Sequence, residues 1–162
     1  MDTRSTDQTT AGVPFPPPLA FLATLGLGFA LHLLFPLHLG RTTVLIDALE
    51  RTGAALALAA LVLAVSAFAS LRRARTSPFP ERPTTALVVR GPFRFTRNPL
   101  YLAMALLPAG IATFSNALLP LLCLVPALVA IRFLVIAREE RYLRLRFGAE
   151  YEAYCRSVRR WL

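Results

Sequence analysis

Long runs of apolar residues that are nearly free of charge constrain this chain more than any other feature. A transmembrane helix needs about 20 such residues to cross the hydrocarbon core of a bilayer. Four segments meet or approach that length, at residues 19–39, 53–71, 100–115 and 117–137. The chain has 162 residues and is 56% hydrophobic, which is too apolar for a soluble domain. The sequence therefore predicts an all-α integral membrane protein with about four transmembrane helices.

These segments also predict the organisation of the chain. Residues 1–18 form a polar, proline-ended and flexible N-terminal tail, residues 19–71 hold two transmembrane helices, and residues 72–162 form the rest. The third and fourth apolar segments adjoin at Ser115 and Asn116, which predicts a tight helical hairpin. Gly26 and Gly28 lie inside the first segment with no strand before them, so they indicate helix packing and not a Rossmann domain.

The arginines predict how the chain is oriented in the membrane. All 18 basic residues are arginine and the net charge is +9. Seven arginines lie in residues 72–97 and seven in residues 138–160, whereas two lie between the first and second segments. Because positively charged loops stay in the cytoplasm, both termini should be cytoplasmic. The arginine bias indicates a GC-rich genome, from which we expect a bacterial inner membrane, and anionic lipid is a better partner for this charge than nucleic acid.

The C-terminal region has the spacing of an amphipathic helix. Apolar and aromatic residues recur at intervals of three and four, at Leu143, Phe147, Tyr151, Tyr154 and Val158. Such a helix would lie on the membrane surface or fold over the mouth of the hairpin. Gly148 interrupts it, and Glu140 with Arg144 and Glu152 with Arg156 are spaced to pair at i,i+4 on the wet side.

Several common kinds of site are not expected. Cys123 lies in an apolar run and Cys155 in a basic tail, so neither a disulfide nor a metal site is predicted. His32 and His38 lie on different helical faces and are expected to pack or to sit at the interface. No Ser-His-Asp or Cys-His set can be assembled from the residues present.

Two polar elements flank the predicted hairpin. Before it stand Gly91-Pro92-Phe93 and Arg97-Asn98-Pro99-Leu100-Tyr101, and after it come Glu139 and Glu140. Asn98 suits a helix N-cap and Pro99 suits the first helical turn, so the first element also fits a simple helix start. The glutamates also fit a solvated exit from the bilayer. A tight hairpin would bring the two elements together on the cytoplasmic side.

Taken together, these motifs resemble those of the isoprenylcysteine carboxyl methyltransferase and phospholipid methyltransferase superfamily of integral-membrane enzymes. Members carry a Gly-Pro-aromatic segment, Arg-His-Pro-x-Tyr, a helical hairpin, Glu-Glu and Phe-Gly-x-x-Tyr-x-x-Tyr. The resemblance covers about residues 85–162, including Phe147-Gly148 with Tyr151 and Tyr154. Asn98 stands where many members have histidine, and an asparagine replaces a hydrogen bond but not a proton shuttle.

The resemblance implies an S-adenosylmethionine-dependent methyltransferase that acts on a lipophilic acceptor from the bilayer. Residues 72–162 would be its methyltransferase core, with the cofactor pocket at the cytoplasmic mouth of the last two helices and the C-terminal helix covering it. Such a pocket needs a cation for the cofactor carboxylate and carboxylates for its ammonium and ribose. It also needs an aromatic wall. The predicted catalytic residues are Arg97 and Glu140, and the predicted cofactor-binding residues are Arg94, Arg97, Asn98, Pro99, Tyr101, Leu102, Glu139, Glu140 and Tyr151.

The acceptor stays open between two chemistries. A carboxylate can be methylated without a base, whereas an amine must first lose a proton. The only candidate bases are Glu139 and Glu140, which favours a carboxylate or thiolate acceptor, with N-methylation of a phospholipid amine as the alternative. A non-enzymatic four-span protein is a third possibility, although a proton-coupled transporter would place a carboxylate inside a span and every acidic residue here lies outside the spans.

Overall fold

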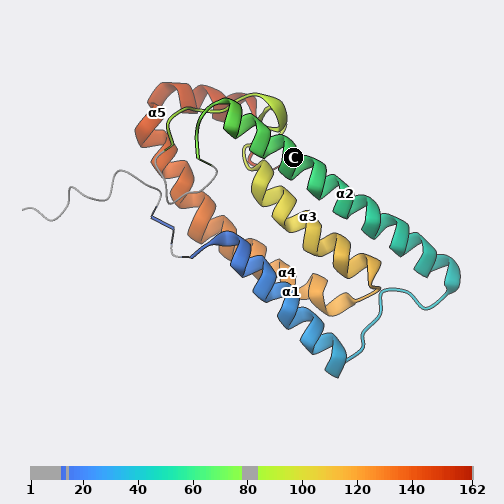
Figure 1. Cartoon of the computed structure of the whole chain (residues 1–162). Coiled ribbons are helices and arrows are strands. Elements are labelled where there is room, and N and C mark those ends of the chain that lie inside the picture. The colour runs from blue at the N-terminus through green and yellow to red at the C-terminus, as the bar shows by residue number, and fades with distance from the viewer. Residues whose placement is uncertain (1–11, 14, 78–83, 162) are drawn as a thin grey trace, which may run out of the picture. The chain divides into compact units, whose positions relative to one another are not determined.

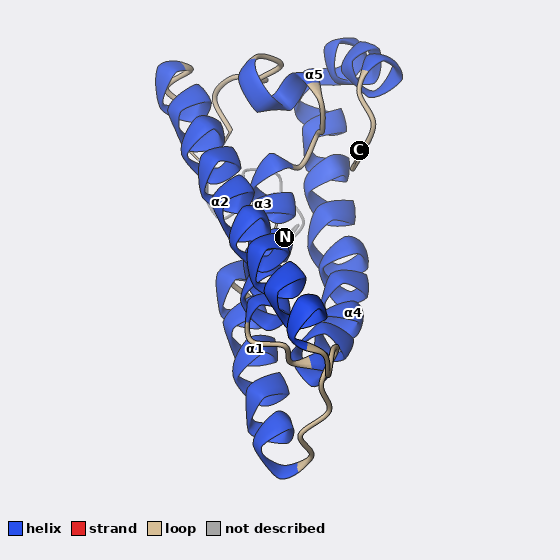
Figure 2. Cartoon of the chain, turned by 90° about the vertical axis from the view of Figure 1, so that its right-hand side faces the viewer, coloured by secondary structure: helices blue, strands red, loops and turns tan. Residues whose placement is uncertain are grey.

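The computed structural model describes residues 12–13, 15–77 and 84–161. Its ordered elements are α1 (Pro17–Leu34), α2 (Thr43–Arg73), the 3₁₀ helix η1 (Gly91–Arg94), α3 (Pro99–Phe114), α4 (Leu118–Ala130), the π-helical turn η2 (Ile131–Ile136) and α5 (Ala137–Ser157) (Figure 1). Within the described ranges no segment forms a strand (Figure 2). The predicted all-α membrane fold is confirmed.

Three described helical stretches are long and apolar enough to cross a membrane: Pro17–Leu34, Thr43–Arg73 and Leu118–Ser157, the last of which comprises α4, η2 and α5. The other predicted span, α3, is apolar but only 16 residues long. Two predicted boundaries were wrong. The first helix ends at Leu34 and not at residue 39, because Pro36 disfavours helix at Phe35. The second begins at Thr43 and not at residue 53, because a charged turn with the pair Asp47 and Arg51 extends it.

The chain divides into two compact units. The first, here called the apolar unit, consists of Phe15–Ala64 and Leu100–Ala130. The second, here called the polar unit, consists of Met1–Pro14, Val65–Pro99 and Ile131–Leu162. The polar unit contains the Arg-Asn-Pro motif up to Pro99 and both glutamates of the Glu-Glu pair, so these predicted site residues belong to one unit.

Glycines hold the helices of the apolar unit close together. A Cβ atom added to Gly28 of α1 would lie 2.4 Å from the Cα of Pro120 in α4. Gly53 of α2 and Gly110 of α3 face each other in the same way, since a Cβ on Gly110 would lie 2.8 Å from the carbonyl oxygen of Gly53. In lipid, helices associate through such close packing because the hydrophobic effect gives little drive between them. The predicted packing role of Gly28 is therefore observed, whereas Gly26 faces open space.

The connection between α3 and α4 is a tight turn as predicted, and it consists of residues 115–117 where the sequence indicated Ser115 and Asn116. Asn116 adopts a φ of 53°, a left-handed conformation that asparagine tolerates better than most residues. Its side-chain amide donates to the carbonyl of Gly40 at 2.9 Å and its amide oxygen accepts from the N–H of Gly40 at 2.8 Å. The turn is thereby tied to the loop between α1 and α2.

The two glycines of the first helix provide a matched test of this packing. We expect Gly28→Ala to destabilise the protein by roughly 1 to 3 kcal/mol, the usual cost of overpacking, because its methyl group meets the backbone of Pro120. Gly26→Ala should be neutral or stabilising by up to about 1 kcal/mol, because alanine is the better helix former. Thermal midpoints in detergent measure both, and equal midpoints would contradict the close contact.

Candidate active site

The segment before α3 is set by two conformationally restricted residues. Gly91 has a φ of +62°, and a Cβ at this position would lie 2.4 Å from the hydroxyl oxygen of Ser70. Pro99 begins α3 and is fully buried, as expected for proline in a first helical turn. Between them, the N–H of Asn98 donates to the hydroxyl of Thr96 at 3.2 Å. Residues 96–98 are thus held in a compact turn that presents Arg97.

The second part of the site comes from α5, which bends at Gly148. This glycine has φ 47° and ψ −122°, a conformation that breaks the helix. The bend allows Arg144 to hydrogen-bond Glu152 at 2.8 Å, although the two residues are eight positions apart. In a straight helix, eight residues advance about 12 Å along the axis. The second half of α5 therefore folds back and brings Tyr151 and Cys155 beside the first half.

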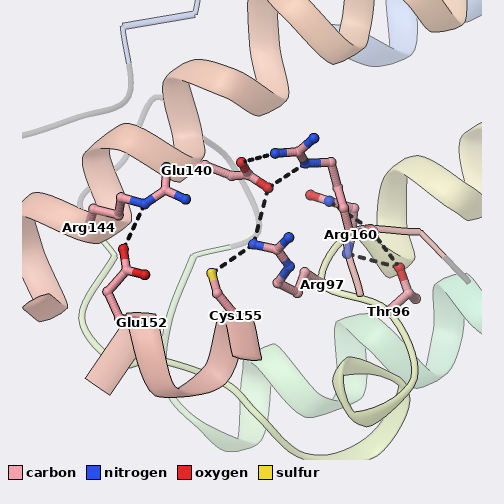
Figure 3. Close-up of polar contacts among 8 residues, drawn as sticks. Thr96, Arg97, Glu140, Arg144, Glu152, Cys155 and Arg160 are labelled. Atoms are coloured by element: carbon pink, nitrogen blue, oxygen red, sulfur yellow. Dashed lines mark hydrogen bonds and ion pairs between the residues drawn. The ribbon is translucent and has the colours of Figure 1, made fainter. Parts of the chain in front are cut away.

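At the centre of the site, Glu140 binds two arginines (Figure 3). The guanidinium of Arg160 donates from Nε to Oε1 and from Nη2 to Oε2, each at 2.7 Å. Nη1 of Arg97 lies 3.3 Å from Oε1. The exposed fractions of the side chains are 6% for Glu140, 12% for Arg97 and 32% for Arg160. One buried carboxylate therefore faces two cations.

Arg97 is the more buried of the two cations, and its hydrogen bonding is incomplete. Its Nη1 also donates to the sulfur of Cys155 at 2.7 Å. Its Nε is buried and has no hydrogen-bond partner within the described part of the chain. A buried N–H without an acceptor is costly, so such groups are often the ones that meet a ligand. The side chains of Arg97, Glu140 and Arg160 together carry one net positive charge, and Nε of Arg97 is a buried donor without an acceptor among the described residues.

The electrostatics of Glu140 depend on these neighbours. Burial alone would raise the pKa of its carboxyl, but the hydrogen bond and charge of Arg160, with the charges of Arg97 and Arg144, hold it below its usual value. Glu140 lies beyond the apolar part of its helix, where charged residues begin at Arg138. The carboxylate is therefore ionised at neutral pH and is a weak base.

Two tyrosines of α5 form the aromatic side of this cluster. The hydroxyl of Tyr154 donates to the carbonyl of Phe93 at 2.7 Å, which links α5 to η1. Tyr151 is fully buried, its ring centroid lies 6.2 Å from that of Tyr154, and the guanidinium of Arg144 lies 6.0 Å from its ring. Burial raises the pKa of both phenols, so they are neutral hydrogen-bonding groups.

The structure brings several predicted site residues together in the polar unit. Arg97, Asn98, Glu140 and Tyr151 all belong to the cluster in the polar unit. Glu139 is half-buried next to Glu140, and Arg94 is exposed at the end of η1. Tyr101, which is buried, and Leu102, which is half-buried, lie in the first turns of α3 within the apolar unit.

Two predicted ion pairs were wrong. Glu140 pairs with Arg160 and Arg97 and not with Arg144, and Glu152 pairs with Arg144 and not with Arg156. The i,i+4 expectation considered spacing within each half of the helix and placed the glutamates on its wet side. The bend at Gly148 redirects Glu152, and Arg160, which follows α5, pairs with Glu140, which is buried.

Sequence reasoning missed Thr96, Cys155 and Arg160 as members of the cluster. Thr96 is buried and its hydroxyl donates to the carbonyl of Arg160 at 3.1 Å. Arg160 stands beside Arg159 near the end of the chain, and no local pattern distinguishes the two. In the described part of the chain, no three His, Cys, Asp or Glu residues are grouped so as to hold a metal ion.

Comparison with known families decides what kind of protein carries this cluster. The model of the family described as phospholipid methyltransferase matches residues 49–150, which is more than half of the chain. The chain belongs to the phospholipid methyltransferase family. This confirms the resemblance to the wider superfamily and identifies a membrane methyltransferase. Comparison with curated proteins and with solved structures gave no match.

The family match includes part of the cluster only. It contains Arg97, Asn98, Glu139 and Glu140 and ends before Tyr151 and Arg160. This phospholipid methyltransferase family member therefore completes its buried ion cluster with residues that lie outside the matched range.

The charge of Glu140 predicts how stability depends on pH. Because its pKa in the folded chain lies below the usual 4.5, the ionised carboxylate stabilises the fold above that pH, and this contribution is lost as pH falls through the folded pKa. We expect Glu140→Gln to lower stability at neutral pH by about 3 kcal/mol, the lower end for a broken buried pair. The difference from wild type should shrink in melts taken from about pH 7 to about pH 3.

Glu150→Gln is the matched control, because Glu150 is an exposed carboxylate on the same helix. It should change stability by no more than about 0.5 kcal/mol at any pH in the series. A constant difference in stability between wild type and Glu140→Gln at all pH values would contradict the role assigned to the charge of Glu140.

Proposed function

We propose that the protein transfers a methyl group from S-adenosylmethionine to a lipid-like acceptor, in the manner of an isoprenylcysteine carboxyl methyltransferase. The observation that carries this proposal is the buried cluster of Arg97, Glu140 and Arg160 on a chain of the phospholipid methyltransferase family. Membership of this family argues against the non-enzymatic alternative. The cofactor and the acceptor are the proposed parts.

The cluster fits the amino-acid end of S-adenosylmethionine. That end carries a carboxylate, and the cluster offers a surplus positive charge and the buried Nε of Arg97, which has no acceptor within the described chain. A charge-assisted hydrogen bond to a carboxylate would satisfy this donor. We therefore assign Arg97 to the cofactor carboxylate, with Glu140 holding the guanidinium in place.

The remaining predicted residues keep supporting roles in this proposal. Asn98 and Pro99 set the turn that carries Arg97, while Tyr151 lines the cluster from α5. Glu139 is proposed to receive the cofactor ammonium or ribose. Arg94, at the end of η1, is the remaining proposed cofactor-binding residue of the polar unit. For Tyr101 and Leu102, at the start of α3, cofactor binding stays a prediction from the sequence resemblance.

The methyl transfer requires little more of the protein. S-adenosylmethionine supplies an already activated methyl group, so the chain has to align donor and acceptor and to exclude water. Burial of Thr96, Asn98, Glu140 and Tyr151 supports water exclusion around the cluster. The helices of the apolar unit expose leucine and phenylalanine side chains, which suits an acceptor that arrives from the bilayer.

The acceptor that this geometry supports best is one that needs no base. Glu140 is bound by two arginines and its pKa is lowered, which makes it a poor acceptor for the proton of an ammonium group. A lipid-linked carboxylate or thiolate avoids that proton transfer. The second candidate is a phospholipid amine, which the family description favours, with half-buried Glu139 as the base.

For the location of the protein, we propose a bacterial inner membrane with both termini in the cytoplasm. The support is the arginine content of residues 72–97 and 138–160, together with the long apolar helices. The site would then face cytoplasmic S-adenosylmethionine.

Cofactor binding can be measured by calorimetric titration of the purified protein with S-adenosylmethionine and its demethylated product. We expect both to bind, and Arg97→Ala and Glu140→Ala each to weaken binding by roughly 1.5 to 3 kcal/mol, the value of a charged hydrogen bond. Arg156→Ala and Glu150→Ala, which remove exposed charges, should bind as wild type does. No binding by wild type at millimolar concentration would refute the proposal.

The acceptor class can be decided with a methyl-labelled cofactor. Wild-type protein in vesicles is supplied either with a farnesylated cysteine analogue that has a free carboxylate or with phosphatidylethanolamine. We expect label in the carboxylate ester and none in the amine product. Label in the phospholipid alone would establish the second candidate, and Glu139→Gln should then abolish it.

A further inference from the structure

The last residues of the chain dock onto the turn that carries Arg97. Val158 leaves α5 in an extended conformation, with φ −129° and ψ 132°. The carbonyl of Arg159 then accepts from the N–H of Arg97 at 3.0 Å. The carbonyl of Arg160 accepts from the hydroxyl of Thr96 at 3.1 Å and from the side-chain amide of Asn98 at 3.0 Å. Residues 158–161, here called the C-terminal segment, are thus bonded to residues 96–98 through three hydrogen bonds.

The side chain of Arg160 ties the same segment to α5 (Figure 3). It occupies both oxygens of Glu140, whereas Arg97 reaches one of them. A bidentate pair between arginine and carboxylate fixes the orientation of both partners. The orientation of Glu140 therefore comes from Arg160, and Glu140 in turn sets the position of the Arg97 guanidinium.

We propose that Arg160 is a positioning residue of the active site, and that the C-terminal segment is a required part of that site. Arg160 fixes Glu140 by its guanidinium and residues 96–98 by its carbonyl, so Arg97 is held from both sides. Arg97 is the residue proposed to bind the cofactor, and the effect of Arg160 on affinity rests on that proposed function. The effect of Arg160 on the docking of the C-terminal segment does not rest on that function.

The alternative is that Arg160 only neutralises a buried charge. Two facts argue against it. Arg97 already supplies one charge to Glu140, and the Arg160 guanidinium contacts both carboxylate oxygens, a geometry that charge neutralisation alone does not require. A neutralising residue would also tolerate lysine, whereas a bidentate contact with both carboxylate oxygens requires the guanidinium.

The first experiment needs no cofactor. Hydrogen–deuterium exchange of the purified full chain reports on the backbone N–H of Arg97, which donates to Arg159. We expect Arg160→Gln to speed exchange at this amide by at least about tenfold, the factor for loss of roughly 1.4 kcal/mol of local stability. Arg156→Gln removes an exposed charge from α5 and should leave this amide as in wild type. Unchanged exchange in Arg160→Gln would overturn the proposal.

The second experiment measures the dissociation constant of S-adenosylhomocysteine against pH. Glu140 is faced by Arg97 from the turn before α3, by Arg160 from the C-terminal segment, and by Arg144 and Tyr151 from α5. Without Arg160, burial acts on a carboxylate with less compensating charge, so its pKa should rise. We expect Arg160→Gln to bind S-adenosylhomocysteine at least about tenfold more weakly than wild type. As the pH is lowered, the affinity of this variant should begin to fall at a higher pH than that of wild type. Arg156→Gln should match wild type at every pH.

Arg160→Lys separates positioning from charge if the glutamine variant does not fold. The lysine keeps the charge but makes one contact where arginine makes two, so we expect faster exchange at Arg97 and weaker binding than wild type. Wild-type exchange and binding in Arg160→Lys would overturn the proposal. If wild type itself fails to bind the cofactor product, the proposed function falls, while the exchange experiment still decides whether Arg160 fixes the turn.

Discussion

A single buried carboxylate with two guanidiniums organises the polar unit of this protein. Burying the charge of Glu140 is expensive, and the cost is offset only if both oxygens are paired and hydrogen-bonded. Arg97 and Arg160 meet this requirement from two segments that are distant in sequence. The turn before α3, the first half of α5 and the C-terminal segment are therefore fixed by one charge. The surplus cation is what makes the cluster suitable for an anionic ligand.

The two units of the chain are held together internally by different physics. In the apolar unit, close contacts at Gly28, Gly53 and Gly110 let helices pack where the hydrophobic effect is weak. In the polar unit, buried ions and hydrogen bonds add to an apolar core that includes Ile131, Val135 and Ile136. Residues of the apolar unit can therefore be tested with substitutions that change side-chain volume. Residues of the polar unit can be tested with substitutions that change charge or hydrogen-bonding geometry.

Sequence reasoning predicted the site unevenly, for reasons that can be traced to particular residues. Arg97, Asn98 and Glu140 stand in motifs with recognisable order and spacing, and these residues lie together in the structure. Arg160 and Cys155 stand in a basic tail with no such pattern. The predicted pairing of Glu152 with Arg156 failed because local spacing cannot say how far the chain turns at a glycine such as Gly148.

The sequence by itself determined the membrane class, the helical fold, the tight turn at Asn116 and the methyltransferase family. These follow from apolar run length, proline and glycine placement, and short motifs, all of which act locally along the chain. Only the tertiary structure decided that Glu140 is buried, that Arg160 holds it, and that the C-terminal segment docks on residues 96–98. The physical reason is that burial and ion pairing depend on which distant segments meet, and an arginine looks the same in sequence whether it faces solvent or a buried carboxylate.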